Sequence, residues 1–262
     1  MKIKLACLIL LAFHFGAFAQ EAAKEPRLKA VYENGRWGYA DRRGKVIIAA
    51  EFDAARPFAD GLAQVGVVDE ELPEIAGRPN LKWGYIDERG RVLVELRYAV
   101  LRDFSENLAA VALLDAKNPE RSFPGRRADR RNLTWGYIDR SGRVVIPVQF
   151  LSAGDFSEGL AQVNVGKVGG DGGESSFCGA PSNYGYIDKT GAFVIKPQFA
   201  RAGSFRNGRA RVSIGRVEYM GRCVCCAPRF VGRHGQVDRS GRFIADKSSN
   251  DDSSLDFEDR EN

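Results

Sequence analysis

The chain has 262 residues, a formal net charge of +5 and two histidines. Beyond residue 19 no stretch is apolar enough to span a membrane, and no signature of a nucleic-acid-binding fold accompanies the positive charge. Once an N-terminal leader is removed, His234 is the one remaining histidine, so a Ser-His or Cys-His arrangement would have to use it. The sequence therefore predicts no membrane span in the mature chain, no nucleic-acid partner and no catalytic residues.

Residues 1–19 are predicted to be a secretory signal peptide. Lys2 and Lys4 precede an apolar run from Leu5 to Phe15, and the small-residue pattern at 17–19 is a cleavage site that ends at Ala19. The run is too short for a membrane span. We therefore expect an exported protein, periplasmic or secreted, whose mature chain opens with a lead-in at residues 20–28.

One short phrase, Trp-Gly-Tyr-Ile-Asp-x-x-Gly, recurs with variations along the rest of the chain. An aromatic residue leads four copies and a histidine leads a degenerate fifth: Trp37, Trp83, Trp135, Tyr184 and His234. These positions are 46, 52, 49 and 50 residues apart, a period typical of tandem repeats. One such unit cannot bury its apolar face alone, whereas stacked neighbours make a continuous core. We therefore interpret the four leading aromatic residues as structural members of the repeat core.

Each copy predicts a β-hairpin. In the second copy the residues from Trp83 to Ile86 alternate with the period of a strand. Asp87 and Gly90 suit the first and fourth positions of a type I turn, and the β-branched run 92–94 predicts the return strand. Each hairpin is followed by two further aromatic residues and a short strand, and residues 29–32 look like a partial copy of that strand. The array is therefore expected to open in the middle of a unit.

The phrase, its spaced aromatic residues and the following Gly-Leu-Ala-x-Val resemble the bacterial WG-containing repeat family over residues 29–245. The resemblance implies β-rich tandem repeats that act as interaction modules, and it supplies no catalytic residues. The fifth copy departs from the pattern, with His234 for Trp and Gln236 for Tyr, and we interpret it as a terminal cap. We expect an all-β tandem β-repeat array of four full units plus a degenerate fifth, either propeller-like or an open twisted solenoid. An acidic tail at 246–262 is expected to be disordered.

Inserts of uneven length separate the repeats and are expected to form loops on one side of the array. The signal peptide contributes +2 and the tail −5, which leaves +8 for residues 20–245. This excess predicts an acidic partner, either a protein or an anionic component of the envelope. The candidate contacts are four arginines of the second insert, which runs from Asp115 to Arg131: Arg126, Arg127, Arg130 and Arg131. A solvated charged loop is the competing interpretation.

Four cysteines remain after removal of the leader: Cys178, Cys223, Cys225 and Cys226. An even number in an oxidising compartment predicts two disulfides. The sequence leaves the pairing open, although the adjacent Cys225 and Cys226 are the least suitable pair because their bond would be strained. Alternatively, Cys-x-Cys-Cys could bind a soft metal or carry out redox chemistry, or the thiols could be free.

From these features we hypothesise a non-enzymatic binding or scaffold protein of the bacterial envelope or secreted space, without a cofactor. The alternative is a thiol-based redox or metal-handling protein that uses the cluster at 223–226. A hydrolase is the third hypothesis.

Overall fold

The computed structural model describes residues 27–70, 80–114, 133–166, 183–218 and 229–246. These residues form antiparallel strands and turns, and none of them belongs to a helix long and apolar enough to cross a membrane. The chain therefore has the predicted all-β fold.

The strands make five small antiparallel sheets, which we number I to V in chain order. Sheet I has three strands and each of the others has four. Sheet I contains β1 (Leu28–Glu33), β2 (Arg36–Asp41) and β3 (Val46–Phe52); sheet II contains β4 (Ala54–Ala55), β5 (Leu62–Val68), β6 (Leu81–Asp87) and β7 (Val92–Tyr98); sheet III contains β8 (Val100–Leu101), β9 (Leu108–Leu114), β10 (Leu133–Asp139) and β11 (Val144–Phe150). Sheet IV contains β12 (Ser152–Ala153), β13 (Ala161–Asn164), β14 (Tyr184–Ile187) and β15 (Phe193–Phe199); sheet V contains β16 (Arg201–Ala202), β17 (Arg209–Glu218), β18 (Arg229–Asp238) and β19 (Phe243–Ala245).

Each sheet joins the end of one sequence copy to the start of the next. In sheet II, for example, β5 follows the first phrase but pairs with β6 of the second, and Val65 lies opposite Gly84. In sheet I the same register places Val31 of β1 opposite Gly38 of β2. This confirms that residues 29–32 are a partial copy of the short strand, although β1 begins one residue earlier, at Leu28. The one sheet with three strands is therefore the first of the row. The degenerate fifth copy supplies β18 and β19 of sheet V, which has four strands.

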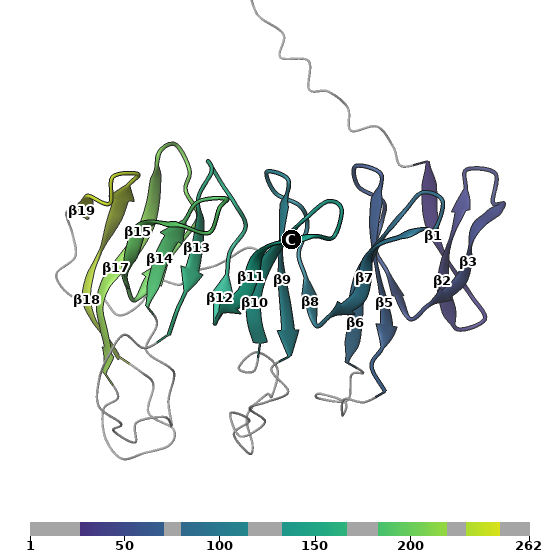
Figure 1. Ribbon diagram of the computed structural model, residues 1–262, viewed down its shortest axis with the longest axis horizontal. Helices are drawn as coiled ribbons and strands as arrows, with labels where there is room; N and C mark the ends of the chain where they lie inside the picture. The colour runs from purple at the N-terminus through teal and green to yellow at the C-terminus, as the bar shows by residue number, and fades with distance from the viewer. Residues whose placement is uncertain (1–26, 71–79, 115–132, 167–182, 219–228, 247–262) are drawn as a thin grey trace, which may run out of the picture.

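The sheets stand side by side in an open row (Figure 1), with sheet I at the right and sheet V at the left. Of the two predicted arrangements, the structure therefore has the open array and not a closed propeller.

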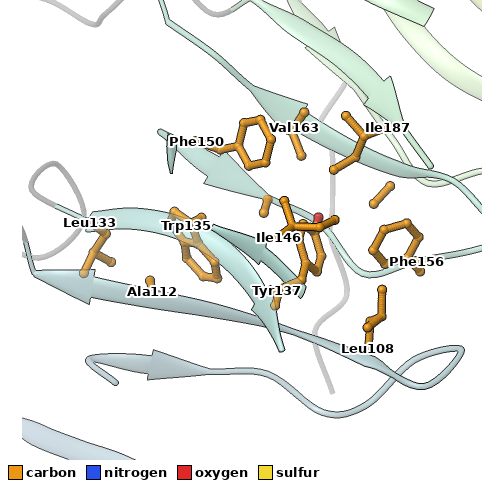
Figure 2. Packing of buried hydrophobic residues seen from close by; sticks show 13 residues of the cluster. Leu108, Ala112, Leu133, Trp135, Tyr137, Ile146, Phe150, Phe156, Val163 and Ile187 are labelled. Atoms are coloured by element: carbon orange, nitrogen blue, oxygen red, sulfur yellow. The ribbon is translucent and has the colours of Figure 1, made fainter. Parts of the chain in front are cut away.

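Four apolar cores fill the spaces between successive sheets. Neighbouring residues of one strand serve different cores: Tyr85 packs in the core between sheets II and III, and Ile86 packs in the core between sheets I and II. Figure 2 shows the core between sheets III and IV, where Tyr137 and Ile146 meet Phe156 and Ile187. The inner sheets are therefore buried on both faces, because alternate side chains point to opposite sides of a strand.

The last sheet ends the row with polar side chains. Ala210, Val212 and Val237 are buried against sheet IV. Arg209, Arg211 and Gln236 alternate with them and face away from the array, and the two arginines are exposed. These three residues take the positions at which sheet III places Leu108, Ala110 and Tyr137 against sheet IV. The fifth copy is therefore a cap, as predicted, and its outward positions are the ones that have changed.

The glycine of the phrase is required by a close backbone approach. The return strand bulges over it, since the pairing of β10 with β11 shifts register on both sides of Tyr137. A Cβ atom added to Gly136 would lie 2.5 Å from the carbonyl oxygen of Ile146 and 2.7 Å from the backbone nitrogen of Val148. No side chain fits at that distance.

The Asp-x-x-Gly segments form the predicted turns. In the second hairpin the Gly90 N–H donates to the Asp87 carbonyl (2.9 Å), and the Asp87 carboxylate accepts from the N–H groups of Arg89 and Arg91 (2.9 Å each). Gly90 has a φ of 79°, which glycine adopts without steric cost. The same bonds recur at Asp41, Asp139, Asp188 and Asp238.

Candidate functional site

The array has two different edges. The segments that join β5 to β6, β9 to β10, β13 to β14 and β17 to β18 leave from strand ends that lie together along the lower edge in Figure 1. At this edge Val68 is paired with Leu81 and Leu114 with Leu133. The Asp-x-x-Gly turns lie at the opposite edge. The predicted placement of all inserts on one side of the array is therefore supported by the strand ends that flank them.

Two groups of predicted site residues lie outside the described residues. They are four arginines of the second insert (Arg126, Arg127, Arg130 and Arg131) and the four cysteines (Cys178, Cys223, Cys225 and Cys226). Both groups stay predictions. Among the residues that the structure does describe, no three His, Cys, Asp or Glu side chains gather as a metal site.

The leading aromatic residues pack against the cores but are not their centre. Trp135 is buried, whereas Trp37, Trp83 and Tyr184 are half-buried and lie beside the core residues. The aromatic residue two positions later is the fully buried one, as at Tyr39, Tyr137 and Tyr186. The sequence interpretation named the lead positions as members of the repeat core; Trp135 is one, and the other three pack against the cores. It did not single out the tyrosine that is present in all four copies.

Each of these inner tyrosines connects two parts of the fold. The Tyr137 hydroxyl donates to the Gly154 carbonyl (2.7 Å), and Tyr39, Tyr85 and Tyr186 make the same bond to the carbonyl 17 residues further on. Burial raises the pKa of each hydroxyl, and it raises the pKa of Tyr85 to about 12. The tyrosines are therefore neutral hydrogen-bond donors of the framework.

His234 occupies the lead position of the fifth copy and meets a serine. Its Nδ1 atom lies 2.8 Å from the Ser213 hydroxyl oxygen across the β17–β18 pair. Ser213 is completely buried, so a substrate has no access to that hydroxyl. This pair is therefore a structural contact across the β17–β18 pair.

The structure also contains a small polar cavity that the sequence did not indicate. It lies between sheets II and III, near the edge that carries the turns, and has a volume of about 70 Å³. Its wall contains Gln64 of β5, Tyr85 of β6 and the loop residues Arg56, Asp103 and Arg140, together with the apolar side chains of Pro57 and Phe104.

Gln64 is the most deeply buried polar residue of this wall, with 2% of its surface exposed. Its Nε2 group donates to the Asp103 carboxylate (2.6 Å) and to the Tyr85 hydroxyl (2.9 Å). Because Asp103 accepts this bond, the amide orientation is set, and the other amide atom, Oε1, is buried without a hydrogen-bond partner among the described residues. A buried acceptor of this kind costs free energy until a donor reaches it.

Two arginines border the cavity, and they differ in whether they form an ion pair. Arg140 pairs with Asp60 (3.3 Å) and lies over the Phe104 ring. Arg56 lies over the Trp83 ring, 5.5 Å from its centroid, and has no ion pair with a carboxylate of the described residues. The cavity therefore offers an available guanidinium and an available amide oxygen, and the sequence could not show this because the residues come from separate repeats.

Comparison with known protein families agrees with the repeat structure. The WG containing repeat family matches four segments, residues 37–67, 83–114, 135–168 and 184–216. The curated proteins contain no match to the chain. Each matched segment begins at a lead aromatic residue and ends in or just beyond the short strand of the following sheet, so four family repeats build the four junctions between the five sheets. The chain is therefore a WG containing repeat protein with four repeats of that family.

Proposed function

We propose that this chain is a non-enzymatic binding or scaffold protein, exported to the periplasm or the exterior, and that the edge carrying the inserts is its partner surface. The observation that carries the proposal is the common origin of the four inserts at one edge of the array (Figure 1). Both faces of the inner sheets are used by the cores, so partners are left with the edges. Inserts of a repeat array typically form its binding face.

The charge of the repeat body indicates the chemistry of the partner. Residues 20–245 carry +8, and the second insert holds five of the arginines that contribute to it, four of them within residues 126–131. Arginine suits carboxylate and phosphate groups because its planar fork donates two parallel hydrogen bonds. The proposed partner is therefore a protein or an anionic envelope component with such groups at its surface.

The test compares two variants of equal charge. In the first, Arg126, Arg127, Arg130 and Arg131 become serine; in the second, Arg42, Arg43, Lys45 and Arg89 at the opposite edge become serine. Binding of the mature protein is measured on phosphatidylglycerol vesicles and on dextran sulfate, with phosphatidylcholine and dextran as uncharged references. We expect the insert variant to lose about tenfold or more in affinity and the control to lose less than about threefold.

Equal losses in the two variants would show that binding follows net charge alone and would contradict the partner surface. Turnover of an envelope substrate that a single substitution abolishes would contradict the non-enzymatic role.

A further inference from the structure

The cavity beside Gln64 differs from the equivalent places between the other sheets. Between sheets III and IV, Ala110 stands where Gln64 stands, and Arg102 and Asp155 approach to 3.8 Å. Between sheets IV and V, Gln162 has the equivalent position, and its amide exchanges hydrogen bonds with the Ser204 hydroxyl at 3.4 and 3.5 Å. The serine can both donate and accept, so it satisfies both ends of that amide.

In the cavity between sheets II and III, Asp103 takes the place that Ser204 has between sheets IV and V. An ionised carboxylate accepts hydrogen bonds but donates none, so Asp103 satisfies the Gln64 amide nitrogen and leaves the amide oxygen without a donor. The missing donor has to come from outside the described residues. Its position is defined by a side chain that is 98% buried and held by two hydrogen bonds.

The charges around the cavity restrict the chemistry of the occupant. Arg140 and Asp60 form an ion pair with each other, which leaves one cation, Arg56, and one anion, Asp103. Both side chains are exposed, so burial does not decide between occupants. An occupant with a single charge would meet one opposite and one like charge in this wall, and the attraction and the repulsion would offset each other. An occupant with one positive and one negative group matches both.

The size of the cavity sets a further limit. A volume of about 70 Å³ holds a few water-sized groups and no large side chain. Two opposite charges within so short a molecule are found in a free α-amino acid, whereas the terminal residue of a peptide carries only one of them.

We infer that the cavity between sheets II and III binds a small free α-amino acid of the size of glycine or alanine. Gln64 Oε1 and the Asp103 carboxylate accept hydrogen bonds from its ammonium group, and Arg56 donates to its carboxylate. This site lies at the edge opposite the inserts, so it is independent of the proposed partner surface, and either can fail without the other.

The experiment is a titration of the mature protein followed by NMR at the Trp83 indole N–H, which is assigned with the Trp83→Phe variant. The Trp83 ring is a suitable reporter because Arg56 lies over it. The probes are glycine and L-alanine, and the references are methylamine and acetate, which each carry one of the two charges. We expect a saturable shift with both amino acids and with neither reference. Gln64→Leu should weaken the binding about tenfold or more, because it removes the acceptor for the ammonium group.

Gln162→Leu is the matched control, since it changes the equivalent residue where Ser204 already satisfies the amide, and it should leave the affinity within about twofold. If Gln64→Leu fails to fold, Asp103→Asn replaces it as the test variant. Asp103 is an exposed loop residue, so its substitution should leave the fold intact, and the same loss of affinity is expected. Absence of a saturable shift with both amino acids overturns the inference. So does an equal response to methylamine or acetate, or undiminished binding by the folded Gln64 or Asp103 variant.

Discussion

At the scale of single residues, the invariant part of each repeat is explained by space and by hydrogen bonding. The glycine of the phrase is present because the bulged return strand passes directly over it, and the inner tyrosine is present because its ring fills a core while its hydroxyl reaches a carbonyl in the next segment. The leading tryptophan is less constrained, and accordingly Tyr184 replaces it in the fourth full copy, which keeps the inner tyrosine; the capping fifth copy replaces both.

The glycine yields a direct prediction. Gly136→Ala should lower the free energy of unfolding by about 3 kcal/mol, because the new methyl group meets backbone atoms that cannot move aside. Gly203→Ala is the control, since a Cβ atom there would lie 3.6 Å from its nearest neighbour, the carbonyl oxygen of Arg211, and its effect should stay within about 0.5 kcal/mol. Urea unfolding followed by circular dichroism measures both. Equal stabilities of the two variants would contradict the explanation.

At the scale of the element, each hairpin is closed by an aspartate that acts as an acceptor for its own turn. The Thr190 hydroxyl donates to the Asp188 carboxylate (2.6 Å), and the backbone N–H groups of Thr190 and Ala192 donate to the same oxygen. The hydroxyl is the main cause that holds the pKa of Asp188 below its usual range, and serine hydroxyls do the same for the pKa values of Asp139 and Asp238.

These lowered pKa values predict an acid dependence of stability. A group whose pKa is lower in the folded state stabilises the fold at pH values above its unfolded pKa, which is about 4, and this contribution is lost as the pH falls through the folded pKa. The free energy of unfolding should therefore fall below about pH 4. Asp188→Asn should show a smaller fall, because asparagine keeps an acceptor in the turn but does not titrate in this range.

The comparison is urea unfolding between pH 2.5 and 7 for the natural chain, the Asp188→Asn variant and a Glu51→Gln variant. Glu51 is an exposed carboxylate whose side chain makes no turn bond among the described residues. The Glu51→Gln variant should therefore show the same pH profile as the natural chain. An unchanged profile in Asp188→Asn would show that the turn carboxylates do not govern acid unfolding.

At the scale of the whole molecule, five sheets with four cores between them form an open row, and the two outer faces need protection from association. Sheet V provides it by placing Arg209, Arg211 and Gln236 outward, and sheet I places the exposed Lys29 where sheet II has the buried Ala63. Terminal repeats with a polar outer face are a general requirement of repeat arrays.

Restoring an internal face to the last sheet should therefore cause self-association. The triple variant Arg209→Leu, Arg211→Ala and Gln236→Tyr gives sheet V the residues that sheet III turns toward sheet IV. We expect this variant to form dimers or larger species in sedimentation velocity, because it exposes a contiguous apolar patch. The control carries the same three new residues at exposed positions elsewhere, as Lys196→Leu, Arg206→Ala and Gln198→Tyr. A triple variant that sediments like this control would argue against the capping role.

The sequence by itself determined the period, the hairpins, the turn chemistry and the cap. These features depend on local rules: strand alternation, the acceptor of an aspartate at a turn, the positive φ of glycine and the spacing of repeated aromatic residues. It therefore predicted the strands around Trp83, the turn from Asp87 to Gly90 and the partial copy at residues 29–32, all of which the structure confirms.

Only the tertiary structure decided which aromatic residue fills each core, that the row stays open, and that a polar cavity lies between sheets II and III. The physical reason is that these features depend on how one sheet stands against the next. Gln64 and Asp103 are 39 residues apart, and neither differs in local sequence from residues that form no such site. The loss of a donor when serine becomes aspartate has an effect only after stacking has brought that aspartate to a buried amide.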